Sequence, residues 1–161
     1  MATFYFDGSD AAATDPDANW SSDANAFDGN IATFASGDIS TTTTGFLKSE
    51  GTSAPTSGLS IISVKARVYG IVTSNNLTAS IYTDGLGELL GEPVNASGGG
   101  GGWGSYVTLT TPSGGWTWAK VAALEVKIWV ESSGVEQVSR VEVEVYSDPI
   151  PGRIYRIQGF Q

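Results

Sequence analysis

The strongest constraint on the fold is a strict alternation of apolar and polar residues in two neighbouring stretches. Between residues 59 and 72, one set of alternate positions is apolar or glycine: Ile62, Val64, Ala66, Val68, Gly70 and Val72. A second set follows at Leu77, Ala79 and Ile81. A period of two residues is typical of a β-strand that buries one face. These stretches therefore predict two successive strands of one sheet, joined by a turn at residues 74–76.

Shorter strands are expected along the rest of the chain. The candidates are residues 3–6, 45–48, 87–94, 103–111, 125–131 and 141–146, separated by turns rich in Gly, Pro and Ser. In the last two, Val126, Ile128, Val130, Val141, Val143 and Val145 are predicted to point inward. One short helix is predicted over residues 116–124, with Thr117 as its N-cap. Residues 97–102 include five consecutive glycines and are expected to form a mobile loop.

This arrangement predicts an all-β fold, a two-sheet antiparallel β-sandwich with at most one short helix. A jelly roll is favoured, and an immunoglobulin-like sandwich is the alternative, although its Cys–Trp–Cys marker is missing. The 161 residues suit one domain. We assign residues 1–148 to the sandwich and residues 149–161 to a C-terminal arm or tail, because Pro149 and Pro151 cannot continue a sheet.

Charge and composition exclude several classes of function. The formal charge is −9, so nucleic acid is not expected as a direct ligand. The chain has no cysteine and no histidine, which excludes disulfides, thiolate or imidazole zinc sites and histidine acid–base chemistry. No nucleophile stands beside a base, and Glu142 and Glu144 are interpreted as solvated surface. We therefore predict that the chain is not an enzyme.

No targeting or membrane segment is expected. The first residues lack the basic and apolar regions of a signal peptide. No apolar run reaches the length that spans a bilayer. The expected product is made in the cytoplasm of its host, with no membrane partner.

The first forty residues are acidic and contain a tight turn. Seven of the 17 acidic residues lie within residues 7–38, and no Lys or Arg precedes Lys48. The turn is Asp28-Gly29-Asn30, whose residue types favour positive φ and side-chain bonds to nearby amides. This region is either a solvated loop or an oxygen-rich cation site, and both interpretations stay open.

The turn and its neighbours carry a family resemblance. Asn25-Ala26-Phe27-Asp28-Gly29-Asn30, with Thr33 three residues later, resembles the A-x-D-G-N-x-x-T turn of discoidin-like, galactose-binding jelly rolls. The resemblance implies a structural calcium, held by the side chains of Asp28, Asn30 and Thr33 and by the carbonyl of Asn25. Oxygen ligands are those that calcium prefers.

Four aromatic residues fall on predicted outward positions: Tyr69, Tyr82, Trp129 and Tyr146. Exposed aromatic side chains bury a large area on contact and keep a polar tip, so they suit protein interfaces and sugar-stacking platforms. The alternative is that another segment of the chain covers them. Trp20, Trp103, Trp116 and Trp118 lie at strand ends or in loops and are expected to cap the core.

The C-terminal segment differs from the rest in charge and is apolar for a free end. It contains Arg153, Ile154, Tyr155, Arg156, Ile157 and Phe160. It either docks on its own domain or acts as an assembly arm that pairs with a neighbouring subunit or capsid protein by strand addition.

The layout over residues 17–147 is similar to that of small jelly-roll structural proteins of tailed phages, which serve as capsid decorations, fibre heads or tail appendages. The resemblance implies a non-enzymatic assembly protein of the virion, whose partners are copies of itself and a capsid or tail protein. The alternative function is a carbohydrate-binding module with a structural calcium and a glycan as its partner.

Overall fold

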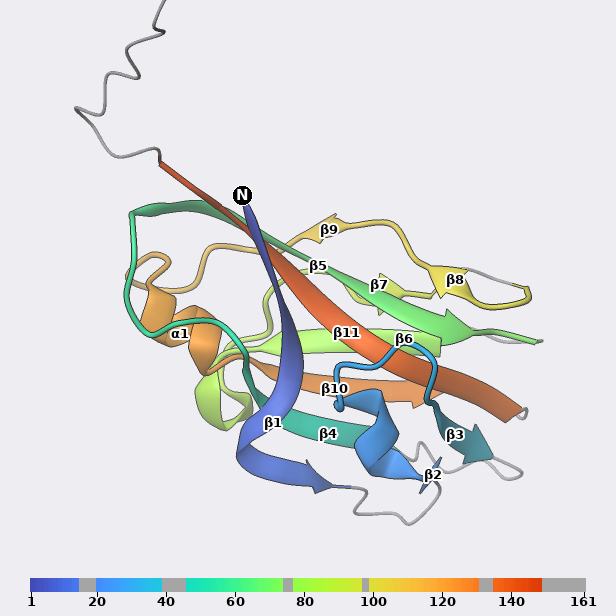
Figure 1. Ribbon diagram of the computed structural model, residues 1–161. Helices are drawn as coiled ribbons and strands as arrows, with labels where there is room; N and C mark the ends of the chain where they lie inside the picture. Colours follow the sequence, from blue (N-terminus) through green and yellow to red (C-terminus); the bar gives the residue numbers. More distant parts are fainter. Residues whose placement is uncertain (15–19, 39–45, 74–76, 97–98, 131–134, 149–161) are drawn as a thin grey trace, which may run out of the picture.

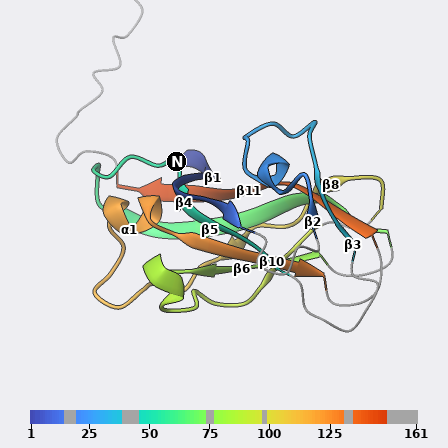
Figure 2. The ribbon, with the colours of Figure 1, turned by 90° about the horizontal axis from the view of Figure 1, so that it is seen from below.

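The computed structural model of the chain describes residues 1–14, 20–38, 46–73, 77–96, 99–130 and 135–148. In this part of the chain, antiparallel strands form two sheets that face each other (Figures 1 and 2). The strands are β1 (Ala2–Thr14), β2 (Trp20–Ser21), β3 (Ala35–Asp38), β4 (Phe46–Thr52), β5 (Ile61–Ile71), β6 (Leu77–Tyr82), β7 (Val94–Asn95), β8 (Gly102–Trp103), β9 (Val107–Thr108), β10 (Glu125–Val130) and β11 (Val135–Ser147).

Sheet A is organised around β11. One edge of β11 pairs with β5 along most of its length, and β5 in turn pairs with β8 and β9. The other edge pairs with β3 at residues 135–138 and with β1 at residues 142–145. Strand β2 completes the sheet beside β3.

Sheet B contains β4, β10, β6 and β7 in that order, with β1 beside β4. The same strand β1 therefore belongs to both sheets. Residues 2–5 pair with β11 in sheet A, and residues from Phe6 onward pair with β4 in sheet B. Two register shifts, between Phe6 and Ala11 and between Ala11 and Thr14, interrupt the pairing with β4.

The core lies between the sheets and consists mainly of alternate apolar residues. The predicted inward residues of β6, β10 and β11 are all buried, as are Val64, Ala66, Val68 and Gly70 of β5. The prediction failed for Ile62, which is 49% exposed, because a register shift between Ser63 and Ile61 breaks the alternation there, and Ile61 packs against the core instead. Burial of this apolar surface is the main force that holds the two sheets together.

The predicted all-β sandwich with one short helix is confirmed. Helix α1 (Trp118–Ala122) lies within the predicted range, and the Thr117 side chain accepts a hydrogen bond from the amide of Lys120, as an N-cap does. Two short 3-10 helices, η1 (Asp23–Ala26) and η2 (Asp84–Leu86), occupy turns. No helix among the described residues is long and apolar enough to span a membrane.

Several strand pairings and boundaries differ from those predicted. Strands β5 and β6 were expected to be neighbours in one sheet, and this prediction is wrong, because β5 pairs with β11 in sheet A and β6 pairs with β10 in sheet B. Strand β1 continues from residue 6 to Thr14, where a polar connection was expected, because β4 supplies its hydrogen-bond partners. Strands β2 and β3 were not predicted, since their sequences are short and lack apolar alternation. The expected strand 103–111 is divided into β8 and β9, and the expected strand 87–94 reduces to β7 and one isolated bridge between Leu89 and Tyr82.

Candidate functional site

The outer face of sheet A, which points away from sheet B, carries a row of long side chains across three strands. Tyr5 on β1 lies opposite Glu142 on β11, and Glu142 lies opposite Arg67 on β5. Side chains that are directly opposite in an antiparallel pair are close enough to interact. In the adjacent row, Tyr69 on β5 lies opposite Trp103 on β8.

Glu142 is the buried centre of this face, with a residue exposure of 3%. Its Oε1 accepts a hydrogen bond of 2.5 Å from Arg67 Nε, and Arg67 Nη2 lies at the same distance from that oxygen. The hydroxyl of Tyr106 donates to Oε1 at 2.8 Å, and Arg140 Nε lies 3.8 Å from Oε2. The expectation that Glu142 is solvated surface is therefore wrong, because its cross-strand neighbours cover and pair it.

Arg67 is held between two aromatic rings. Its guanidinium carbon lies 4.0 Å from the ring centroid of Trp103 and 4.4 Å from that of Tyr106. The Trp103 ring also meets Tyr69 edge to face at a centroid distance of 5.2 Å, and Phe34 lies 6.3 Å from Tyr69. Cation–π and edge-to-face contacts fix the orientation of the rings they join. We call these five side chains the aromatic cluster: Phe34, Arg67, Tyr69, Trp103 and Tyr106.

The hydroxyl of Tyr106 has an altered acidity. Burial and the hydrogen bond to Glu142 raise the pKa of Tyr106 from 10.0 to about 12, because both disfavour a second negative charge beside the carboxylate. Tyr106 therefore stays a neutral hydrogen-bond donor over the whole physiological pH range. The hydrogen bond from Tyr106 to the carboxylate of Glu142 therefore persists, and it holds the Tyr106 ring beside Arg67.

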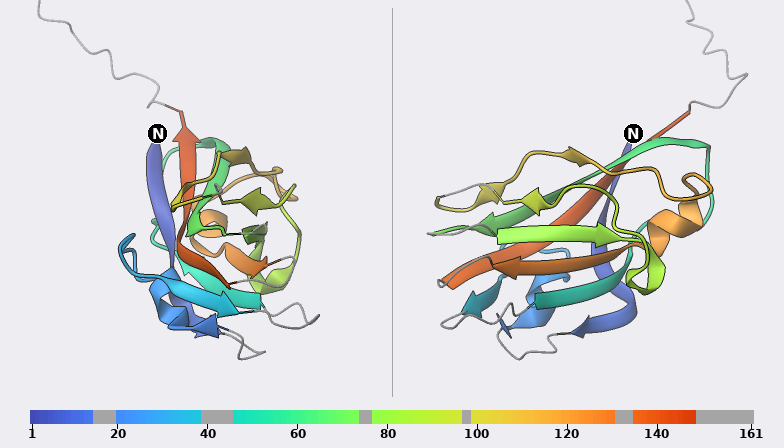
Figure 3. Two further views of the ribbon diagram at one scale, coloured as in Figure 1. Left: turned by 90° about the vertical axis from the view of Figure 1, so that its right-hand side faces the viewer. Right: turned by 180° about the vertical axis from the view of Figure 1, so that it is seen from behind.

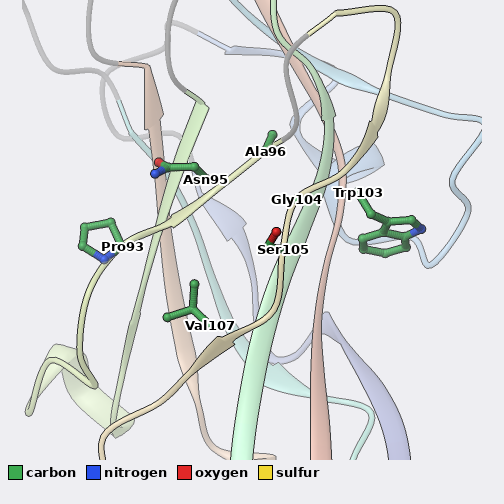
Figure 4. A pocket seen from close by; sticks show the side chains of 7 residues that line it. All are labelled: Pro93, Asn95, Ala96, Trp103, Gly104, Ser105 and Val107. Atoms are coloured by element: carbon green, nitrogen blue, oxygen red, sulfur yellow. The ribbon is translucent and has the colours of Figure 1, made fainter.

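A hollow of about 320 Å³ lies beside the aromatic cluster, between the β7 segment and the segment that joins β8 to β9. Figure 4 shows the Trp103 ring pointing away from Pro93, Asn95 and Val107, so the ring borders the hollow from outside, on the side where Tyr69 and Arg67 lie. The residues that line it are Pro93, Asn95, Ala96, Trp103, Gly104, Ser105 and Val107.

Close backbone packing forms the floor of this hollow. The amide of Gly104 donates to Val68 O at 2.9 Å, and a Cβ on Gly104 would overlap the carbonyl oxygen of Asn95. Glycine is therefore required here for a close approach of two chain segments. The Asn95 side-chain oxygen accepts a hydrogen bond from the hydroxyl of Thr78, which leaves its Nδ2 without a partner among the described residues.

The four predicted outward aromatics do not form one surface. Tyr69 and Tyr146 lie on sheet A, whereas Tyr82 and Trp129 lie on sheet B. Within sheet A, Tyr146 on β11 lies opposite Ser63 on β5. Ser63 is six residues from Tyr69 along β5, which corresponds to about 20 Å. Tyr69 belongs to the aromatic cluster, and Tyr146 is 44% exposed at the far end of the same sheet.

The Asp28 turn forms a corner of the sandwich that is closed by its own hydrogen bonds. Asp28 accepts from the Asn30 amide at 2.7 Å and from the Thr33 hydroxyl at 2.6 Å, and the Asn30 side chain accepts from Ala32 at 3.0 Å. Gly29 takes a φ of 74°, as predicted for the turn.

This corner is attached to β11 and to the chain that follows it. Ser139 Oγ donates to Asn30 O at 3.1 Å, and Arg140 Nη1 donates to Gly29 O at 3.2 Å. The side-chain amide of Asn25 donates to Phe34 O at 3.1 Å. Calcium bound by Asn25, Asp28, Asn30 and Thr33 stays a prediction.

The remaining predictions concern the C-terminal arm, the glycine loop, the tryptophan residues and a metal site. The assembly-arm residues Arg153 to Phe160 lie outside the described residues, as does the start of the glycine loop at residues 97–98. Trp20 is 8% exposed and belongs to the core, and Trp116 and Trp118 pack against it, as expected of core caps. No group of three or more acidic side chains close enough to hold a metal occurs in the described part of the chain.

Comparisons with known proteins give distant structural likenesses. No family model and no curated protein matches the chain. It resembles the C-terminal CBM6 carbohydrate-binding module of a laminarinase from Zobellia galactanivorans, with 8% identity, coverage of 88% of this chain and 98% of that chain, and a TM-score of 0.48.

Two further solved structures show similar likeness. The enzymatically active domain of tailspike protein 4 of bacteriophage CBA120 has 13% identity, coverage of 80% of this chain and 20% of that chain, and a TM-score of 0.47. The GH26-CBM35 β-(1,4)-mannanase of Podospora anserina has 9% identity, coverage of 93% and 28%, and a TM-score of 0.40. Likenesses this distant assign no function to the chain.

The sequence did not reveal the main residues of this site. Trp103 was expected to cap the core, and Arg67 and Tyr106 were assigned no role. One sequence signal could have pointed to the site. Arg67 and Glu142 have opposite charges, and both fall on outward positions of alternating strands. Only the strand register shows that these two residues are neighbours.

Proposed function

We propose that the chain is a non-enzymatic carbohydrate-binding domain, and that a sugar ring binds beside Trp103. The observation that carries this proposal is a half-buried indole at the edge of a hollow, held in one orientation by Arg67 and Tyr69. An aromatic ring offers a flat apolar surface to the C–H groups of a sugar.

The hollow next to the Trp103 backbone, on the side away from the ring, offers hydrogen-bonding groups to a neighbouring sugar unit of the same glycan. The free amide hydrogens of Asn95 and the exposed hydroxyl of Ser105 lie in the same hollow. A binding site of this kind combines apolar surface with a few convergent hydrogen-bonding groups. Because the cation–π and edge-to-face contacts already orient Trp103, little conformational entropy is lost when a ligand binds.

The test is a glycan array followed by titration calorimetry with the glycans retained. We expect Trp103→Ala to weaken binding at least tenfold, because the stacking surface is removed. Trp129→Ala, a matched change on sheet B, should leave the affinity unchanged. Retention of no glycan by the intact chain, or equal affinity in Trp103→Ala, would overturn the proposal.

A second candidate function is the assembly subunit of a phage particle, as a capsid decoration, fibre or tail appendage. It is favoured by one observation, a group of exposed apolar side chains at the end of the sandwich opposite the Trp103 hollow. Co-sedimentation with particles would support this function, and a monomer that binds glycans and no particle would oppose it.

A further inference from the structure

One end of sheet A exposes apolar side chains that come from three separate segments. Strand β1 begins there, β11 ends there, and the connection from β4 to β5 passes beside both (Figure 3). We define the end surface as Met1, Leu59, Ile62 and Tyr146, which are 76%, 38%, 49% and 44% exposed. Among the described residues, only two other large apolar side chains, Ile31 and Leu89, are comparably exposed.

The end surface also has unused backbone groups. The backbone of Tyr5 bonds to Ser53 on the edge of β1 that faces away from β11. Alternation along a strand places the N–H and C=O of Thr3 on that same edge. No described residue pairs with them, so a short segment of open strand edge lies beside the exposed apolar side chains.

The rest of the chain starts at this surface. The amide of Asp148 donates to Ser60 O at 2.9 Å, so the next 13 residues begin beside Leu59. They include five large apolar side chains: Ile150, Ile154, Tyr155, Ile157 and Phe160. They carry two arginines and no acid, whereas the preceding residues carry six basic and 17 acidic residues. The segment and the domain are therefore complementary in charge and in apolar character.

We propose that the end surface binds residues 149–161 of a second copy of the chain, so that two copies exchange C-terminal segments. Asp148 and Ile150 each precede a proline, and a residue that precedes proline favours extended backbone. Thirteen extended residues reach about 45 Å. Because the segment starts beside the surface that it binds, two copies related by a twofold axis exchange segments over a short distance.

This proposal does not rest on glycan binding. Trp103 lies opposite Tyr69, about 20 Å along β5 from Ser63, which is the partner of Tyr146. A failure at one surface therefore leaves the other testable. The proposal names a partner for the assembly function, a second copy of this chain, and the experiment below measures that contact alone.

The test compares full-length variants by native mass spectrometry and analytical ultracentrifugation over a concentration series. The intact chain should dimerise. Ile62→Arg places a charge on the end surface opposite the basic segment and should weaken the dimer at least tenfold. Ile31→Arg is the matched control, since Ile31 is 45% exposed on the Asp28 corner, and it should leave the dimer unchanged.

A second variant tests the segment itself. Ile157→Ser together with Phe160→Ser leaves the sandwich intact and should weaken the dimer as Ile62→Arg does. A monomeric intact chain, or a dimer that neither variant weakens, would overturn the proposal. If both variants lower the melting temperature of a monomer, the segment docks on its own domain, and the exchange between copies is wrong.

Discussion

At the scale of single residues, Glu142 organises the outer face of sheet A. Its carboxylate accepts hydrogen bonds from Arg67 and Tyr106 while almost fully buried, and Arg67 in turn orients the Trp103 ring. A buried carboxylate is tolerated only where it is paired and hydrogen-bonded, which is the case here. The position of the proposed sugar-stacking ring therefore depends on an acid that the ligand does not need to touch.

The shifted pKa of Tyr106 predicts a loss of stability at alkaline pH. Between pH 10 and about 12 the folded chain keeps a phenol proton that the unfolded chain has released. The contribution of Tyr106 is therefore complete below pH 10 and is lost as the pH rises towards 12. Urea unfolding at several alkaline pH values should show a steeper decline for the intact chain than for Tyr106→Phe. Parallel curves would contradict the assigned pKa.

At the scale of elements, the segment from β8 to β9 shows how one glycine positions a surface. Gly104 lies between the backbone of β5 and that of β7, and these contacts shape the hollow beside Trp103 (Figure 4). A methyl group at this position meets a backbone carbonyl that cannot rotate away. The two segments must therefore separate if any larger residue replaces the glycine.

We accordingly expect Gly104→Ala to lower the free energy of unfolding by about 2 kcal/mol. Glycan binding should weaken in the same variant, because separation of the segments opens the hollow. Ser105→Ala is the control for stability alone, since Ser105 is exposed and its hydroxyl belongs to the proposed binding site. Chemical denaturation measures the first effect. An unchanged midpoint for Gly104→Ala would show that the segment can move without cost.

Elements with one apolar face could be predicted from the sequence, and elements defined by their partners could not. Strands β5, β6, β10 and β11 alternate because the core requires it, and helix α1 shows its N-cap. The second half of β1 is polar and is a strand only because β4 lies beside it. Register, which the sequence does not contain, brings Glu142 to Arg67 and Tyr69 to Trp103. For this reason the fold was predictable and the candidate site was not.

At the scale of the whole molecule, β1 joins the two sheets. Its first residues pair with β11 in sheet A, and Phe6, which is fully buried, begins the part that pairs with β4 in sheet B (Figure 1). A strand shared in this way couples the sheets, because neither can lose it without exposing the core between them. We therefore expect both sheets to unfold together.

Deletion of residues 1–5 tests this coupling. The ladder pairs from Ala2 to Tyr5 and the contact of Phe4 with Trp118 are lost, so the free energy of unfolding should fall by about 3 kcal/mol. Circular dichroism and tryptophan fluorescence should report a single shared transition. Removal of Met1 alone is the control and should have no measurable effect. Two separate transitions in the shortened chain would show that the sheets unfold independently.

The shared strand also sets an order on biosynthesis. Strand β1 leaves the ribosome before the other strands of the sandwich, but its partner in sheet A, residues 142–145, is among the last parts of the sandwich to be made. The apolar side chains at the start of β1 consequently stay without their partners in sheet A until residues 142–145 have been synthesised. The sandwich can complete its fold only after β11 has emerged, and until then its first strand is a target for chaperones and for pairing with other nascent chains.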